Sequence, residues 1–227
     1  MRRVRWIGGG ILLIAAIAIY ALLAAPSGPR TLRSFNPDRM ADLETRMWQA
    51  YYSKENVRLF GLLVTTLREQ YHYSWLTATI EGYHLARAAA TFGNARANYE
   101  TVLPDLEAGY VTAKQWLRAG FDPEAVARAE LAWWVARRIP GEDSPEHVGA
   151  LMADAYALLY EAPRSQLLRA AVLRAQAAAL RDTTAENPDW DAVERLLQES
   201  YRDLHTSLAM VTHDDARNSV FVTGDTG

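Results

Sequence analysis

The stretch FNPDRMADLETRMW, residues 35–48, contains the signals that predict the fold. The side chain of Asn36 can accept a hydrogen bond from a free N–H group in the first turn of a helix, and Pro37 has a φ angle preset for the first helical position. Phe35 and Met40 occupy the two positions of a hydrophobic staple across that helix start. The stretch therefore predicts a helix that begins at residue 37.

Similar start signals recur along the chain. Asp122-Pro123, Ser144-Pro145 and Asn187-Pro188 repeat the pairing of a capping side chain with proline, and Ser74 is a further cap candidate. Strand patterns are nearly absent, and the apolar periodicity predicts seven helices, at about residues 37–72, 75–93, 103–119, 123–138, 145–161, 164–182 and 188–209. We expect an all-α fold, arranged either as a roughly seven-helix bundle or as a short array of α-hairpins.

Two of these helices have faces that predict close packing. The last helix has an apolar stripe at spacings of three and four, formed by Trp190, Val193, Leu197, Tyr201, Leu204 and Leu208. In the helix at 75–93, small residues such as Ala78, Gly82 and Ala86 recur in the same rhythm. We expect the stripe to face the core and the small residues to admit a neighbouring helix.

An uncharged apolar segment near the N-terminus predicts a membrane anchor. Residues 7–25 contain no charged side chain, and at about 1.5 Å per residue they can cross the hydrocarbon layer of a bilayer. A cleaved signal peptide is the alternative, but its apolar region is usually shorter, and cleavage after Ala25 would place Pro26 beside the cut. Because arginines precede the segment, we expect a single-pass protein of the plasma (inner) membrane with its C-terminal domain outside the cytoplasm.

These patterns divide the chain into four parts: a membrane anchor at 1–25, a linker at 26–36, an all-helical extracytoplasmic domain at 37–209 and a flexible tail at 210–227. The chain has no cysteine, which excludes disulfides and thiolate metal sites. Its net charge is −3 and its basic residues form no cluster, so we expect no nucleic-acid partner.

Two Glu-x-x-His motifs predict where a metal ion would bind. Glu69 and His72, and likewise Glu81 and His84, stand three residues apart, which places a carboxylate and an imidazole on one side of a helix. Their oxygen and imidazole ligands suit zinc, manganese or iron. All four residues could form one mononuclear site across the turn between the two helices. Because such pairs are common on solvated helix faces, we favour ordinary helix surface, with His72 placed favourably at a helix C-terminus.

Residues 40–90 resemble half of a ferritin-like di-metal carboxylate protein. That family takes a carboxylate from each of two helices and a Glu-x-x-His from each of two others, and Glu44 with Glu81 and His84 matches one such half. The resemblance implies Glu130 as the next carboxylate. The second histidine position holds Arg164, directly after Pro163, so the chain departs from the family's pattern there.

Glu130 and a set of aromatic residues are further candidates. Glu130 lies in an otherwise apolar run with Trp133 and Trp134, so it should be partly buried and paired, with Arg87, Arg137 or Arg138 as the expected partner. The two tryptophans could line a ligand groove or pack in the core, as could a second aromatic group, Tyr51, Tyr52, Tyr71, Tyr73 and Trp75. We expect packing for most of them.

The sequence leaves three functional hypotheses. The first is a membrane-anchored helical domain that acts in interaction or assembly, through a protein partner or self-association. The second is an enzyme, a membrane-tethered ferritin-like oxidoreductase that uses Fe, Mn or Zn. The third is a small-molecule binding module, which predicts a large apolar pocket near Trp133 and Glu130.

Overall fold

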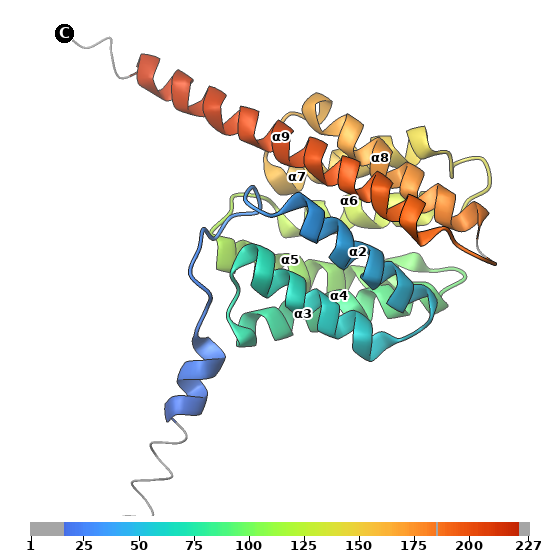
Figure 1. Cartoon of the computed structure of the whole chain (residues 1–227), viewed down its shortest axis with the longest axis horizontal. Helices are drawn as coiled ribbons and strands as arrows, with labels where there is room; N and C mark the ends of the chain where they lie inside the picture. The colour runs from blue at the N-terminus through green and yellow to red at the C-terminus, as the bar shows by residue number, and fades with distance from the viewer. Residues whose placement is uncertain (1–15, 185, 223–227) are drawn as a thin grey trace, which may run out of the picture.

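The computed structural model describes residues 16–184 and 186–222, which form helices and no β-strand (Figure 1). The predicted all-α class is therefore confirmed. After a helical segment at 16–23, the helices are α2 (Pro37–Tyr52), α3 (Asn56–Tyr71), α4 (Trp75–Asn94), the 3₁₀ turn η1 (Tyr99–Val102), α5 (Leu103–Leu117), α6 (Pro123–Ala136), α7 (Pro145–Tyr160), α8 (Arg164–Thr183) and α9 (Trp190–Val222).

The helices form a closed series of α-hairpins. From α2 to α9, every helix packs against the next one along the chain, and α2 also packs against α9. Figure 1 shows α2 running between α9 on one side and α3 and α4 on the other. The first and last helices of the domain thus lie side by side and close the array.

Most of the predicted helix starts are confirmed. The side chains of Asn36, Ser74, Asp122 and Ser144 each accept a hydrogen bond from a backbone N–H in the first turn of their helix. The start at Asn187-Pro188 is wrong by two residues. Helix α9 begins at Trp190, and its cap is Asp189, whose Oδ1 accepts from the N–H of Ala192 at 3.0 Å.

The predicted helix at 37–72 is two helices. It breaks at Ser53, Lys54 and Glu55, where Lys54 adopts a left-handed conformation with φ of 58°. The backbone N–H of Glu55 donates to the carbonyl of Ala50 at 2.8 Å, so the turn satisfies part of the helix end. No glycine or proline marks this turn in the sequence, and the break makes α2 and α3 an antiparallel pair.

The two ends of the described chain differ from the predicted anchor and tail. Helix α9 continues to Val222, so its predicted end at 209 is too early and residues 210–222 of the predicted tail are helical. Among the residues that the structure describes, no helix is long and apolar enough to cross a membrane. The predicted span at 7–25 begins outside those residues, and its described part is the helical segment at 16–23.

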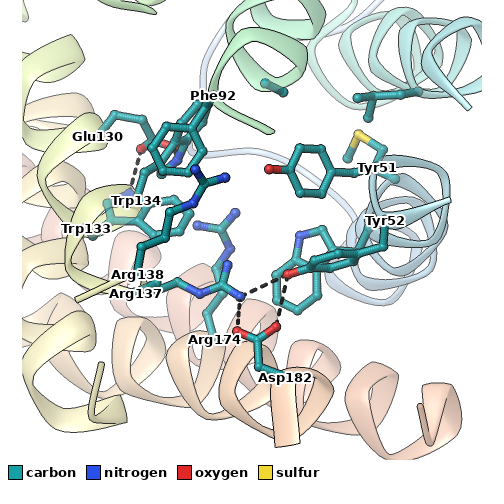
Figure 2. A pocket seen from close by; sticks show the side chains of 14 residues that line it. Tyr51, Tyr52, Phe92, Glu130, Trp133, Trp134, Arg137, Arg138, Arg174 and Asp182 are labelled. Atoms are coloured by element: carbon teal, nitrogen blue, oxygen red, sulfur yellow. Dashed lines mark hydrogen bonds and ion pairs between the residues drawn. The ribbon is translucent and has the colours of Figure 1, made fainter. Parts of the chain in front are cut away.

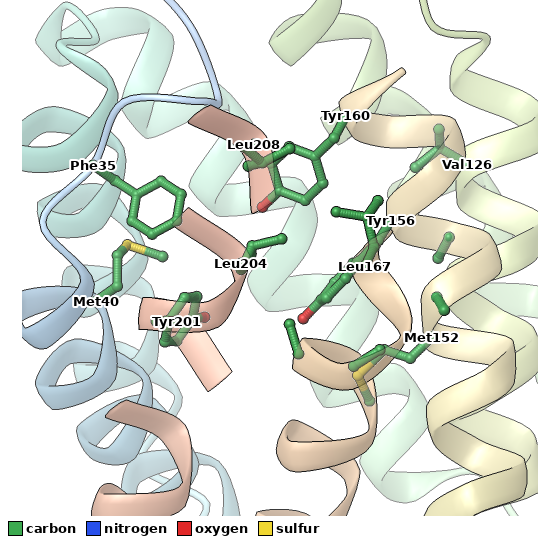
Figure 3. Packing of buried hydrophobic residues seen from close by; sticks show 14 of the residues in the cluster. Phe35, Met40, Val126, Met152, Tyr156, Tyr160, Leu167, Tyr201, Leu204 and Leu208 are labelled. Atoms are coloured by element: carbon green, nitrogen blue, oxygen red, sulfur yellow. The ribbon is translucent and has the colours of Figure 1, made fainter. Parts of the chain in front are cut away.

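The main core takes buried residues from every helix from α2 to α9, and Figure 3 shows part of it, with residues of α2, α6, α7, α8 and α9. The predicted stripe of α9 is buried there at Val193, Leu197, Tyr201, Leu204 and Leu208, while Trp190 is only partly buried. Phe35 and Met40 are buried in the same cluster, as the hydrophobic staple predicts. The segment before α2 is therefore packed into the domain.

Helices α7 and α8 approach each other closely at a glycine. A Cβ added to Gly149 would lie 2.7 Å from Val172 Cα, which is backbone and has no freedom to rotate away. Along α8 the buried positions are mostly alanine, including Ala170, Ala171 and Ala175. Small residues on both helices thus set the short distance between them.

We predict opposite effects of the same substitution at two helical glycines. Gly149→Ala should lower the free energy of unfolding by about 1–3 kcal/mol, because the new methyl group forces α7 away from α8. Gly61→Ala should raise it by about 0.5–1 kcal/mol, because nothing lies within 4 Å of the new Cβ and alanine favours the helix. Chemical denaturation of both variants checks this; a neutral Gly149→Ala would contradict the close approach.

Candidate ligand-binding pocket

A cavity of about 330 Å³ lies on the side of the domain where α2 and α4 face α6 and α8 (Figure 2). It is lined by Met47, Trp48, Tyr51, Tyr52, Leu59, Ala89, Phe92, Glu130, Trp133, Trp134, Arg137, Arg138, Arg174 and Asp182. Six of the fourteen lining residues are aromatic, and three guanidinium groups enter the cavity. This is the position near Trp133 and Glu130 at which the binding hypothesis predicts a pocket.

Glu130 holds the two tryptophans of the pocket wall. Its Oε2 accepts from Trp133 Nε1 and its Oε1 from Trp134 Nε1, both at 3.0 Å. The indoles lie three and four residues further along α6, so one turn of helix brings both N–H groups to one carboxylate. The two rings meet edge to face with centroids 6.0 Å apart. Glu130 thereby fixes the orientation of both indoles.

The arginine that acts on Glu130 in the structure is none of the three predicted partners. The nearest opposite charge is Arg174 of α8, whereas Arg87, Arg137 and Arg138 are engaged elsewhere. Burial raises the pKa of the Glu130 carboxyl, although Arg174 and the two indole N–H groups act in the opposite direction. Arg174 stands 44 residues after Glu130 in the chain and on another helix, so no local sequence pattern indicated this partner.

Arg174 forms the floor of the pocket, and Glu44 binds it from beneath. Its Nε donates to Glu44 Oε1 at 2.8 Å, its Nη2 donates to the same oxygen, and the Tyr201 hydroxyl donates to Oε2. The side chain of Glu44 is only 3% exposed and that of Arg174 15% exposed. The guanidinium also lies 5.1 Å from the centroid of the Trp133 ring. Both groups are therefore held rigidly by each other.

Arg137 closes one edge of the pocket. Its Nη2 donates to Asp182 Oδ2 at 2.7 Å and to the Tyr52 hydroxyl at 3.0 Å, as the dashed lines in Figure 2 show. Arg181 lies 3.1 Å from the centroid of the Tyr52 ring. These contacts join α2, α6 and α8 through one ionic cluster at the edge.

Arg138 has a different environment from the other two arginines. Its Nη1 donates to the carbonyl of Ala95 at 2.9 Å, and its guanidinium stacks 3.7 Å from the centroid of Phe92. Among the described residues, no carboxylate lies within ion-pair distance of it. Arg138 is thus a positioned cation without an anionic partner in that part of the chain.

The six predicted metal ligands do not come together. Glu44 binds Arg174, Glu130 binds the two indoles, and Glu69 binds Arg39 across α2 and α3 with Nε to Oε2 at 2.8 Å. His72 ends α3 in a left-handed conformation, as expected for a helix terminus, and packs against Gly28. Within residues 16–184 and 186–211, whose side chains the structure describes, there is no group of three or more His, Asp or Glu side chains that could hold a metal ion.

In the second motif Glu81 is buried in the core, whereas His84 is partly exposed. His84 Nδ1 lies 3.0 Å from Asp105 Oδ1 of α5, and Arg87 donates to the other oxygen of Asp105 at 2.5 Å. Glu81 instead points into the core and is 5% exposed. The ferritin-like resemblance therefore does not extend to the ligand geometry, because Glu81 and His84 face different surroundings.

Glu81 is a buried acid without a cation. Neither its Oε2 nor the hydroxyl of nearby Tyr73 has a hydrogen-bond partner among the described residues. Burial raises the pKa of Glu81 to about 8, although Tyr73 acts in the opposite direction. The carboxyl is thus protonated in the folded protein at neutral pH.

Sequence reasoning found part of the pocket. Trp133, Trp134, Tyr51 and Tyr52 line it, whereas Tyr71 and Tyr73 are core residues and Trp75 is half exposed beneath Arg68. The residues that it missed are Arg174, Asp182, Phe92 and the aliphatic wall. Arg174 and Asp182 stand out as charged residues on the Ala-rich helix α8, and this was the one indication of them in the sequence. Nothing in the sequence pairs them with residues of α2.

Comparison of the chain with models of protein families, with curated protein sequences and with solved structures gave no match.

We predict a pH-dependent stability difference between wild type and Glu81→Gln. Because the pKa of Glu81 is raised in the folded state, the folded protein binds the proton more tightly than the unfolded chain, and ionisation destabilises it as pH rises from about 4.5 to 8. The variant should match wild type near pH 4.5 and become more stable by up to about 5 kcal/mol above pH 8. Urea unfolding at both pH values measures the difference.

The control for this comparison is Glu107→Gln, because Glu107 is exposed on α5 and water hydrates its carboxylate in both states. Its difference from wild type should stay small at every pH. An equally flat profile for Glu81→Gln would show that the Glu81 carboxyl is not protonated in the fold.

Proposed function

We propose that this chain is a membrane-tethered module that binds a small organic molecule in the pocket between α2, α4, α6 and α8. The observation that carries the proposal is the cavity of about 330 Å³ with aromatic walls and three inward guanidinium groups. Pockets for small ligands typically have volumes of about 300–1,000 Å³, mostly apolar walls and a few convergent polar groups. This cavity has all three features.

The walls of the pocket support binding over simple imperfect packing. The cavity is partly open to solvent, so a ligand can enter it from outside. Here the polar groups around the void are already positioned, since Glu130 holds two indoles and Asp182 holds Arg137. A ligand entering such a site orders few side chains, which lowers the entropic cost of binding.

The membrane tether is the part of the proposal that rests on the N-terminal segment. Residues 7–25 carry no charge, and Ile17, Tyr20 and Leu23 in the helical part are each more than half exposed in the described structure. The linker then packs on the domain, where Arg30 lies 4.0 Å from the Trp116 ring centroid and Arg33 donates to the carbonyl of Tyr160. This attachment would hold the domain close to the plasma membrane, on its extracytoplasmic side.

We predict that alkaline phosphatase fused after residue 227 is active in bacterial cells. The enzyme needs an oxidising compartment to form its disulfides, and the proposed orientation places the C-terminus outside the cytoplasm. Replacing Arg2, Arg3 and Arg5 by glutamate should reduce the activity, since these residues favour the cytoplasmic side. Activity of a cytoplasm-dependent reporter alone at the same position would contradict the orientation.

The assembly role expected from the sequence requires a surface for a partner. The row Leu76, Ile80 and Tyr83 on α4 is exposed and apolar at helical spacing. Nothing on this face indicates what covers it, whereas the pocket already contains oriented polar groups. We therefore propose ligand binding in the pocket rather than an assembly role.

We predict that filling the cavity abolishes binding of two small naphthalene probes. The full chain in detergent should bind naphthalene-2-carboxylate or its neutral amide saturably, measured by calorimetry with micelles alone as the blank. Ala89→Phe should remove this binding, because Ala89 lines the cavity and the added ring occupies it. Ala97→Phe, at an exposed loop position, is the matched control and should bind like wild type.

Circular dichroism and thermal melting verify that both variants are folded. Absence of saturable binding of either probe to the wild-type chain would contradict the proposed function. Equal binding to wild type and Ala89→Phe would place the probes elsewhere on the protein.

A further inference from the structure

We propose that the ligand of the pocket is an aromatic monocarboxylate and that Arg138 binds its carboxylate. This inference rests on the proposed function, because it assigns a ligand class to the same pocket. Three observations support it: Arg137 and Arg174 are already paired with carboxylates, Arg138 is not, and the rest of the cavity wall is mostly apolar.

The three arginines of the pocket are not equivalent. Arg137 donates to Asp182 at 2.7 Å, and Arg174 is bound to Glu44 beneath the floor. An anionic ligand at either of them would have to compete with a carboxylate that is already in place. Arg138 lies among the Ala95 carbonyl, the Phe92 and Tyr99 rings and the Tyr51 hydroxyl, and no described carboxylate pairs with it. A ligand carboxylate can therefore pair with Arg138 without breaking an ion pair.

Arg138 is positioned as a rigid anion receptor. The carbonyl of Ala95 holds one of its terminal nitrogens, and the face of Phe92 supports the guanidinium plane. A guanidinium has five N–H groups, so its contacts with Phe92, Ala95 and the Tyr51 hydroxyl leave other N–H groups of the fork for a ligand. Because a planar fork matches a carboxylate, two parallel bonds to one ligand group are possible.

Tyr51 supplies a second polar contact at the same place. Figure 2 shows its hydroxyl pointing into the cavity toward the Arg138 guanidinium. A Cβ added to Gly93 would lie 3.3 Å from this hydroxyl, so the glycine at the end of α4 leaves the space that the hydroxyl occupies. The phenol can donate to a carboxylate that Arg138 binds. The cation, from the turn after α6, and the hydroxyl donor, from α2, thus converge on one place.

The remaining walls favour an aromatic body with a single charge. Met47, Leu59, Ala89 and Phe92 provide apolar surface, and the Phe92 and Trp134 rings, with centroids 5.1 Å apart, offer aromatic contacts. A second negative charge on the ligand would approach Glu130 or Asp182, which also line the cavity. Both carboxylates therefore disfavour dianions such as phosphate monoesters.

The test compares a carboxylate with its neutral isostere in the full chain in detergent. Wild type should bind naphthalene-2-carboxylate about 10-fold or more tightly than naphthalene-2-carboxamide, since a charge-assisted pair with arginine is lost in the amide. Naphthalene-2,6-dicarboxylate should bind less tightly than the monocarboxylate. In Arg138→Gln the preference for carboxylate over amide should fall to about 2-fold or less, with amide affinity retained.

Two further variants complete the design. Arg58→Gln, at an exposed position on α3, is the matched control and should keep the full preference. Arg138→Lys keeps the cation without the planar fork and should restore part of the preference that glutamine removes. If Arg138→Gln melts at a lower temperature than wild type, the preference of Arg138→Lys for carboxylate over amide tests the role of the cation instead.

The outcomes separate this inference from the proposed function. If neither naphthalene probe binds wild type, the proposed function itself fails. If both probes bind wild type equally, or Arg138→Gln retains the full preference, the pocket binds organic molecules but Arg138 does not recognise a carboxylate. If wild type binds the dicarboxylate more tightly than the monocarboxylate, the assignment of a singly charged ligand is wrong.

Discussion

The buried pair of Arg174 and Glu44 is the interaction on which the rest of the domain depends. It joins α2 to α8, and the Tyr201 hydroxyl brings α9 to the same carboxylate. Removing two charges from water is costly, and their attraction offsets the cost only where further hydrogen bonds satisfy both groups. Here guanidinium, carboxylate and phenol provide those bonds for one another. Removal of one partner would leave an uncompensated charge in the core.

This pair also explains how the array of hairpins is closed. Consecutive helices pack on each other because their connections are short, but the contact of α2 with α9 brings together segments that are distant in the chain. Apolar burial of Leu197, Leu204 and Leu208 drives the contact, while the polar cluster fixes the rotation of the helices about their axes. A different register of α8 against α2 would separate Arg174 from Glu44.

The pocket is a consequence of the same arrangement. Arg174 forms its floor, Glu130 orients the Trp133 and Trp134 indoles above it, and Arg137 with Asp182 closes the edge. The Trp133, Trp134 and Tyr52 side chains cannot collapse into the space between them, because each is held by a polar contact. The void is thus maintained by hydrogen bonds and ion pairs in its walls, and these same groups determine which ligand chemistry it favours.

The sequence by itself determined the helical class and the starts of most helices, because caps and prolines act on the backbone within a few residues. It likewise predicted the buried stripe of α9 from local periodicity. It did not determine the turn at Lys54, where a residue other than glycine adopts the left-handed conformation and leaves no compositional mark. Glu81 and His84 match a ligand motif by spacing, yet one is buried against Tyr73 and the other pairs with Asp105. Which arginine meets which carboxylate depends on helix rotation and on contacts across more than a hundred residues. Only the tertiary structure decided that Arg174 pairs with Glu44 while Arg138 remains a cation beside the cavity, because side-chain pairing at such separations is fixed by packing and carries no local signal.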